Sequence, residues 1–373
     1  MKKPAALTAT LVVAAAIGLT TIGATWASTA PVTLEQVQKV TRSEDALRLT
    51  RKSESLIAAG DLQALTHYLT YLKAAPEIAT AAREKLLYDT VMGMAALKPD
   101  DSARRAIDEL TRYPSETLVW HQEHGHREAR RAFDVAAAAR FTERRWSETA
   151  ARDKTLRWLA AGDPTPLTAY PEAPPPDRRG MTEAFAAADL RHLAGQRDTL
   201  AAQLEGGKPV GELALITAMR LRDPTLMGAV LRKADSAVAV AAVGELKGDD
   251  RFPEAANLLL VALERPATAS AAMLALGRLA PHDARIEQQL LDRFGTEDGA
   301  SAAAALARQA DERLLDRIAG ILGTEDDERR QRHALLALRL SDSERAAGHL
   351  RAYAADPATP DALRQEVPSW LVD

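Results

Sequence analysis

An apolar spacing that recurs between Gly211 and Asp356 restricts this chain to a narrow class of folds. Five short segments carry apolar residues at offsets 0, 1, 4, 7 and 8, or a close variant of these, which places them on one face of an α-helix. The segments begin at residues 226, 255, 286, 314 and 346, so successive starts are 28 to 32 residues apart. The clearest copy is Leu314, Leu315, Ile318, Ile321 and Leu322.

The helix expected before each of these segments ends in a second recurring signature, in which alanine is followed by small and apolar residues. Small residues let two helices approach closely, and the neighbouring Leu or Val fills the remaining space. One hairpin cannot bury its apolar face alone, so neighbouring hairpins must stack. The copies are Ala218-Met219-Arg220-Leu221, Ala242-Val243-Gly244-Glu245-Leu246, Ala275-Leu276-Gly277-Arg278-Leu279, Ala305-Leu306-Ala307-Arg308 and Ala337-Leu338-Arg339-Leu340. We therefore predict an all-α protein, an α-solenoid of stacked helical hairpins.

Two stretches, Ala275-Leu276-Gly277-Arg278-Leu279 and Leu335-Leu336-Ala337-Leu338-Arg339-Leu340, resemble HEAT-type repeats, in particular the short bacterial kind. The resemblance covers roughly residues 209 to 356, and the repeat is shorter than the roughly 40–47 residues of the usual HEAT or armadillo unit. It implies a HEAT-like C-terminal array with a protein-binding groove, and it implies no reaction. An irregular alanine-rich helical bundle is the alternative.

Residues 31–161 also read as helices, without one register that fits them all. Thr33 and Gln36 predict a capping box at the first helix, one helix is expected to start at Pro114, and the longest is expected over 127–160. We interpret this half as a divergent helical-hairpin region, with a separate helical domain as the alternative.

A proline-rich segment, residues 162–180, separates the two halves and predicts a long loop or linker, because proline lacks a backbone donor and favours extended geometry. Residues 181–373 then form the repeat array with a C-terminal cap. Trp370 and Leu371 are expected to cover the exposed end of the last hairpin, since terminal repeats need an atypical cap.

The N-terminus predicts export. Lys2 and Lys3 precede an uncharged stretch from Ala5 to Ala27, which is typical of a secretory signal in residues 1–27 with cleavage after Ala27. The alternative is an uncleaved membrane anchor, because this stretch is long enough for one helix of about 20 residues. Either interpretation places the body in a periplasmic or other extracytoplasmic compartment, secreted or tethered.

Charge and cysteine content exclude several classes of function. The 48 basic and 52 acidic residues leave a net charge of −4, which argues against nucleic acid as a partner. The chain has no cysteine, which excludes disulfides, thiolate metal sites and cysteine nucleophiles. Membrane contact is expected at most through the N-terminal segment.

One cluster offers candidate metal ligands, namely His121, Glu123, His124 and His126. Imidazole and carboxylate groups are ligands of zinc and copper, and His121 and His124 would share a face if the segment were helical. The order of residues does not match a zinc-protease motif, because Trp120 stands where that motif needs histidine. A polar helix end or loop is the competing interpretation.

The stretch Arg127–Arg157 holds nine basic residues against five acidic ones, which allows contact with an anionic surface such as lipid or peptidoglycan. A solvated helix crossed by opposite-charge pairs is the alternative.

Catalytic signatures are absent: the sequence has no nucleophile elbow, no phosphate-binding loop and no dinucleotide fingerprint. We therefore expect no catalytic residue, no cofactor and no enzyme activity. The predicted function is a non-catalytic exported scaffold or adaptor that binds another cell-envelope protein along its solenoid surface. The alternatives are an envelope metal-binding protein or enzyme, and a protein that binds anionic membrane or peptidoglycan.

Overall fold

The computed structural model describes residues 30–123, 126–248, 252–280, 283–324 and 327–371. The chain divides into two compact units, which meet between Trp146 and Ser147, inside helix α6 (Val135–Ala160). The segment 1–27, for which the sequence predicts a signal or an anchor, lies outside the described residues. Where the structure is described, no helix has the length and hydropathy needed to cross a bilayer.

The first unit contains short antiparallel helices. They are α1 (Leu34–Thr41), α2 (Glu44–Ala59), α3 (Leu62–Ala74), α4 (Thr80–Met94), α5 (Asp101–Leu110) and the first part of α6. Helix α2 packs on α3 and α4, α3 packs on α4 and α5, and α1 packs on α2 and α4. Thr142 and Trp146 of α6 donate hydrogen bonds to the carbonyl oxygens of Val91 and Met94, which adds α6 to the layer of α2 and α4. The helical-hairpin character predicted for this half is confirmed.

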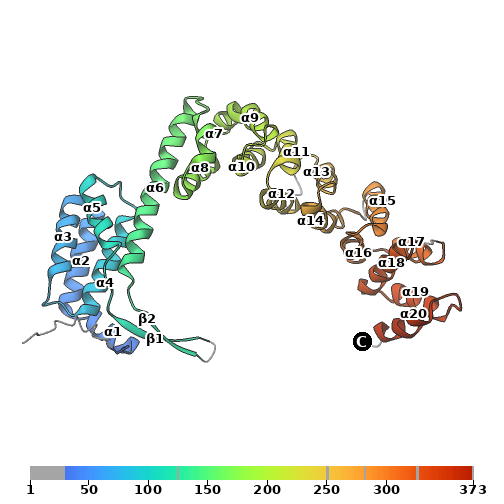
Figure 1. Ribbon diagram of the computed structural model, residues 1–373, viewed down its shortest axis with the longest axis horizontal. Coiled ribbons are helices and arrows are strands. Elements are labelled where there is room, and N and C mark those ends of the chain that lie inside the picture. Colours follow the sequence, from blue (N-terminus) through green and yellow to red (C-terminus); the bar gives the residue numbers. More distant parts are fainter. Residues whose placement is uncertain (1–29, 124–125, 249–251, 281–282, 325–326, 372–373) are drawn as a thin grey trace, which may run out of the picture. The chain divides into compact units, whose positions relative to one another are not determined.

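A two-stranded antiparallel ribbon interrupts the helices of the first unit (Figure 1). Strand β1 (Leu118–Glu123) pairs with β2 (His126–Arg131), and Trp120 lies opposite Ala129. The expectation of a helix starting at Pro114 and another spanning 127–160 is therefore wrong, and α6 begins only at Val135. Strand β2 is polar and arginine-rich and does not show the alternation of apolar and polar residues typical of a half-buried strand, because all six of its residues are exposed.

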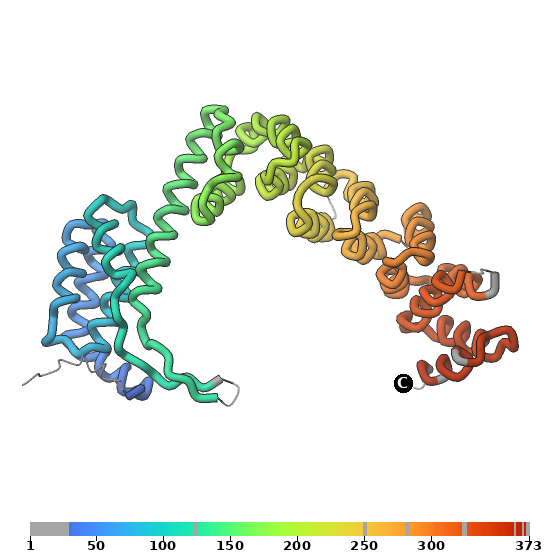
Figure 2. The backbone as a smooth tube through the Cα atoms, in the orientation of Figure 1, coloured from blue at the N-terminus to red at the C-terminus, as the bar shows by residue number. Residues whose placement is uncertain are grey.

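The second unit is a linear stack of helices arranged in two layers (Figures 1 and 2). Helices α8, α10, α12, α14, α16 and α18 pack successively on one another and form the first layer. In the second layer, α9, α11 and α13 pack in the same way, as do α17 and α19. Sequential stacking of hairpins, predicted from the apolar spacing, is confirmed, and the repeated signatures fall on the expected helices.

The helices of the second unit that follow α6 have these bounds: α7 (Thr165–Ala169), η1 (Tyr170–Glu172), α8 (Pro175–Ala187), α9 (Leu190–Glu205), α10 (Gly211–Leu221), α11 (Pro224–Lys233), α12 (Ser236–Gly248), α13 (Ala255–Ala262), α14 (Pro266–Leu276), α15 (Ala284–Asp292), η3 (Arg293–Gly295), α16 (Gly299–Ala307), α17 (Glu312–Thr324), α18 (Glu328–Leu340), α19 (Glu344–Ala355), α20 (Asp361–Glu366) and η4 (Val367–Leu371).

The proline-rich segment 162–180 is not the loop or linker that its composition suggested. It contains α7, the short helix η1 and the start of α8, in which prolines occupy the first helical positions, where a missing N–H costs nothing. Leu167 and Tyr170 are buried in the second unit. The Tyr170 hydroxyl donates a 2.6 Å hydrogen bond to Glu212 of α10. The segment is thus part of the array, and the boundary between the units lies further back, within α6.

The predicted capping box is confirmed, and so is the contribution of Trp370 to the terminal cap, whereas the side chain of Leu371 lies outside the described part of the structure. Thr33 and Gln36 form both hydrogen bonds of a capping box. At the C-terminus, Trp370 packs against the core of the array, and the Arg339 guanidinium lies 4.8 Å from the centroid of its ring.

Two buried tyrosines predict a loss of stability at alkaline pH. Burial, assisted by the hydrogen bond to Glu212, raises the pKa of Tyr170 to about 12, and burial likewise raises the pKa of Tyr68 to about 12. Because an ordinary tyrosine pKa is about 10, the neutral phenols stabilise the fold fully below about pH 10, and this contribution is lost as pH rises towards 12. Thermal unfolding followed by circular dichroism should show this decline, and Tyr170→Phe should reduce it. Ultraviolet titrations in which Tyr68→Phe and Tyr170→Phe each remove a group ionising near pH 10 would contradict it.

Candidate functional site

The first layer of the second unit presents an uncharged surface to solvent. Residues 236–244 of α12, 266–276 of α14 and 299–307 of α16 include no charged side chain, although each helix has one side exposed. We call this surface the uncharged face. Its exposed or half-exposed residues include Ala237, Val240, Ala241, Gly244, Ala267, Ser270, Ala271, Leu274, Ala300, Ser301 and Ala304.

Two large apolar side chains stand out on the uncharged face. Val240 is 41% exposed and Leu274 is 38% exposed, whereas the opposite sides of the same helices, including Ala242 and Leu276, are buried in the core. A helix on the surface of a soluble protein usually carries charged residues on its outer side, and a helix that is apolar all round is usually covered on all sides. The exposed sides of α12, α14 and α16 therefore have the composition of a covered surface.

Close packing makes α14 and α16 adjacent parts of one surface. A Cβ atom added to Gly277, which directly follows α14, would lie 2.6 Å from the carbonyl oxygen of Ala305, so glycine is needed for this approach. On the exposed side, Ser301 donates a 3.0 Å hydrogen bond to Ser270, which pairs the two hydroxyls across the same interface. The uncharged face has no acidic, basic, histidine, cysteine or tyrosine side chain among its residues.

Basic residues mark the C-terminal ends of the same three helices. They are Lys247, Arg278 and Arg308, all exposed. Each lies where a positive charge interacts favourably with the helix dipole. Glu245, two residues before Lys247 on α12, is an acidic exception among these basic residues. Asp249, Asp250 and Arg251, which follow α12 in the sequence, lie outside the described residues.

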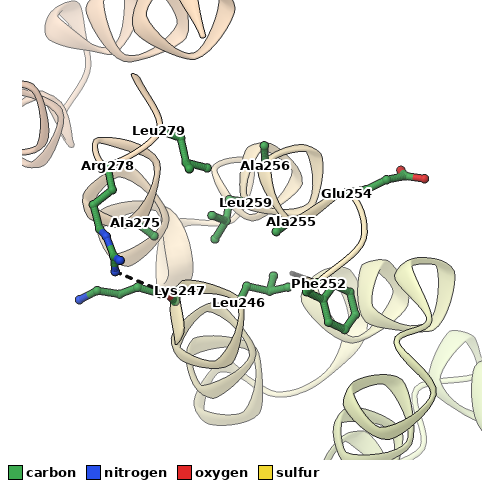
Figure 3. A pocket seen from close by; sticks show the side chains of 10 residues that line it. All are labelled: Leu246, Lys247, Phe252, Glu254, Ala255, Ala256, Leu259, Ala275, Arg278 and Leu279. Atoms are coloured by element: carbon green, nitrogen blue, oxygen red, sulfur yellow. Dashed lines mark hydrogen bonds between the residues drawn. The ribbon is translucent and has the colours of Figure 1, made fainter. Parts of the chain in front are cut away.

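A cavity of about 420 Å³ lies at this edge, between the end of α12, the start of α13 and the end of α14 (Figure 3). Leu246, Leu259 and Leu279 are among its apolar lining residues, and Arg278 donates a 3.3 Å hydrogen bond to the carbonyl oxygen of Lys247. The bond joins the end of α14 to the end of α12. Arg220 makes the equivalent contact two repeats earlier, donating to the Ala188 carbonyl oxygen at 2.9 Å.

The candidate metal ligands fall on the β-ribbon rather than on a helix. His121 and His126 project from the same face of the ribbon, where His121 lies opposite Glu128 and Glu123 opposite His126. His124 lies outside the described residues, and only the backbone of Glu123 is described. Among the residues whose side chains are placed, no three His, Asp or Glu residues are close enough to hold a metal ion.

The ribbon is firmly held at its base and exposed along its length. Glu84 of α4 is completely buried, and its carboxylate accepts hydrogen bonds from the backbone N–H groups of Glu116 and Thr117, at 2.5 and 3.1 Å. Further out, Trp120 is 43% exposed, and the Arg127 guanidinium lies 4.8 Å from the centroid of its ring. This arrangement supports a stable projection with an aromatic and cationic surface.

The stretch 127–157, interpreted from sequence as one basic helix, is divided between two elements. Arg127, Arg130 and Arg131 lie on β2, where Arg130 pairs with Glu128 and Arg131 with Asp134, at 3.1 and 3.4 Å. On α6, Arg140 donates to the carbonyl oxygen of Thr111. Because of this division, the basic residues do not form one continuous helical face.

No protein-family model matches the sequence, and no curated protein matches it either. The candidate site is therefore defined by its geometry alone.

Sequence reasoning did not single out the uncharged face, although it identified the repeats that build it. A signal was present, namely three helices of one layer, α12, α14 and α16, that each lack a charged residue over nine or more positions. In sequence such helices are indistinguishable from fully buried ones, so the pattern gains its meaning only when one side is seen to be exposed.

Proposed function

We propose that this protein is a non-catalytic exported scaffold that binds another protein of the cell envelope through the uncharged face of α12, α14 and α16. The main supporting observation is that the exposed sides of these helices carry no charged side chain and include the large apolar residues Val240 and Leu274. Soluble proteins rarely leave contiguous apolar surface uncovered, and such surface marks interaction sites.

The energetics favour a partner that covers Val240 and Leu274. Full burial of a Val or Leu side chain contributes about 1.5–3 kcal/mol. Covering the exposed two-fifths of each would therefore add about 1 kcal/mol, and the surrounding alanines would add further area. The rigid two-layer packing of the array keeps this surface formed before binding, which reduces the entropic cost of association.

The HEAT-type assignment and the export of the protein belong to the same proposal. Sequential stacking of hairpins about 30 residues long supports the assignment, and the basic, then apolar N-terminal sequence supports export. Stacked repeats commonly use one extended layer as a binding surface. The scaffold role is inferred from this architecture and from the uncharged face, since a fold by itself does not determine a function.

Photo-cross-linking in the native cell tests the proposal. A photoreactive amino acid at Ala241, on the uncharged face, should give a reproducible adduct of one defined mass. The same residue at Gln289, on the exposed side of α15, is the matched control and should not give it. Leu274→Glu should reduce the adduct at least about tenfold, because it places a charge in an apolar contact.

Leu274→Glu should leave folding intact, since substitutions at exposed helix positions usually change stability by about 0.5 kcal/mol or less. Its thermal midpoint should therefore match that of the unsubstituted protein. The proposal would be overturned by an equal adduct from Ala241 and Gln289, or by an Ala241 adduct that Leu274→Glu does not affect.

A further inference from the structure

The dimensions of the uncharged face match one α-helix. The uncharged part of α12 runs for nine residues, from Ser236 to Gly244, which is about 13 Å at 1.5 Å per residue. Packed helices lie about 8–10 Å apart, so α12, α14 and α16 together span about 16–20 Å across the array. A helix with its side chains is about 10–12 Å wide. It fits within this face when it lies across the three helices.

We propose that the partner segment is an amphipathic α-helix lying across α12, α14 and α16, with its apolar side on the uncharged face and carboxylates along the flank that faces the C-terminal ends of these helices. The inference rests on the proposed function and specifies the partner that the site takes.

The lack of polar groups on the face favours a helix over an extended peptide. An extended segment would bring backbone N–H and C=O groups against the face, where each buried group needs a partner. The hydroxyls of Ser270 and Ser301 already bond to each other. A helix satisfies its own backbone and presents only side chains, so it can be covered by an apolar surface without leaving polar groups unpaired.

Charges at the two ends of the array helices give the bound helix an orientation. Lys247, Arg278 and Arg308 follow one edge of the face, where Glu245 and Glu254 are acidic exceptions. At the opposite ends of the three helices lie Asp235, Glu297 and Asp298, together with one basic residue, Arg265, which donates to the carbonyl oxygen of Leu231. Carboxylates on the partner are thus attracted to the first edge and repelled from the second, which specifies direction as well as partner.

The same spacing predicts the partner's sequence pattern. Successive array helices are about 8–10 Å apart, which corresponds to about five to seven residues along a crossing helix, and a spacing of about seven residues, or two turns, keeps side chains on one flank. Acidic residues are therefore expected at about i, i+7 and i+14 on one flank, beside an apolar face.

A lipid surface is less suited to this site than a helix. Segments that bind at membrane interfaces expose Trp, Phe or Leu in quantity. The uncharged face has no aromatic side chain, and Val240 and Leu274 are its only large apolar residues. Its alanines and glycine instead leave shallow grooves that accept the ridge of another helix.

Titration of defined peptides against the full protein tests the inference. One peptide of about 18 residues would carry leucines on one face and glutamates at i, i+7 and i+14 on the flank, and its isomer would carry lysines at those positions. We expect the glutamate peptide to bind at least about tenfold more tightly than the lysine peptide, with a difference that decreases as salt is added.

Two double variants separate the effect of position from that of net charge. Lys247→Glu with Arg308→Glu should reverse the preference between the peptides, and it keeps Arg278, which bonds to the end of α12. The matched control, Lys98→Glu with Arg232→Glu, makes the same change in net charge at exposed residues that belong neither to the face nor to its basic edge, and it should preserve the preference. Leu274→Glu should weaken binding of the glutamate peptide.

Several outcomes would overturn the inference. The first two are equal affinity for both peptides and no binding of either peptide up to about 1 mM. The third is a preference between the peptides that Lys247→Glu with Arg308→Glu leaves unchanged. The fourth is displacement of the peptide by phosphatidylglycerol vesicles, which would indicate that the face binds a lipid surface instead. An Ala241 adduct in the cell combined with failure of the peptides would reject the acidic helix while leaving the proposed function supported.

Discussion

Replacing Arg313 and Arg317 together by alanine is expected to lower the free energy of unfolding of the second unit by about 3–5 kcal/mol. Both arginines, on α17, donate to the carboxylate of Glu287 on α15, and Arg313 does so with two nitrogens, at 3.1 and 2.5 Å. The Glu287 side chain is completely buried, whereas those of Arg313 and Arg317 are 57% and 38% exposed. The double variant leaves a buried carboxylate without its cations, which is more costly than losing an exposed ion pair.

Urea unfolding followed by circular dichroism measures the loss, and hydrogen exchange locates it. Because each helix contacts only its near neighbours, protection should fall mainly in α15 and α17. Arg345→Ala is the matched control, since Arg345 and Asp316 form a similar pair on α19 and α17 with both side chains about half exposed. The control should cost less than about 1 kcal/mol. A loss for the double variant no larger than that of the control would contradict the explanation.

Gly180→Ala is expected to destabilise the second unit by about 1–3 kcal/mol. Alanine normally stabilises the interior of a helix relative to glycine by about 1 kcal/mol. At Gly180 of α8, however, the added Cβ would overlap the backbone oxygen of Glu148 on α6 and would lie 2.9 Å from the Cβ of Ala151. The two helix backbones would have to separate, and their contact would be lost.

Gly195→Ala provides the opposite case. Gly195 is also in a helix, α9, but a Cβ at this position meets no atom within 4 Å. This substitution should therefore raise the thermal midpoint, while Gly180→Ala lowers it. Changes of the same sign would show that helix propensity, rather than the approach of α8 to α6, controls both positions.

The register of the second unit could be predicted from sequence because local and tertiary requirements coincide there. Leu314, Leu315 and Ile318 repeat at helical spacing, and they are buried in the structure. Stacking similar hairpins reuses the same contacts in every repeat, so the pattern in the sequence and the pattern in the core are the same.

Prediction failed where composition and tertiary context disagree. The prolines of residues 162–180 suggested an extended linker, yet they lie at helix starts, where proline is tolerated. The ribbon at 118–131 was missed because Arg127, Arg130 and Arg131 are all compatible with a helix surface. It is held instead by a contact distant in sequence, between Glu84 and the amides of residues 116 and 117.

The sequence by itself determined that this chain forms stacked helical hairpins, because the apolar period of each helix is a local property and the repeat specifies its neighbour. Only the tertiary structure decided which apolar sides are left uncovered. Val240 and Val243 are equally apolar, yet one faces solvent and the other lies in the core. That difference depends on which helices α12 packs against, and it is the difference on which the proposed binding surface rests.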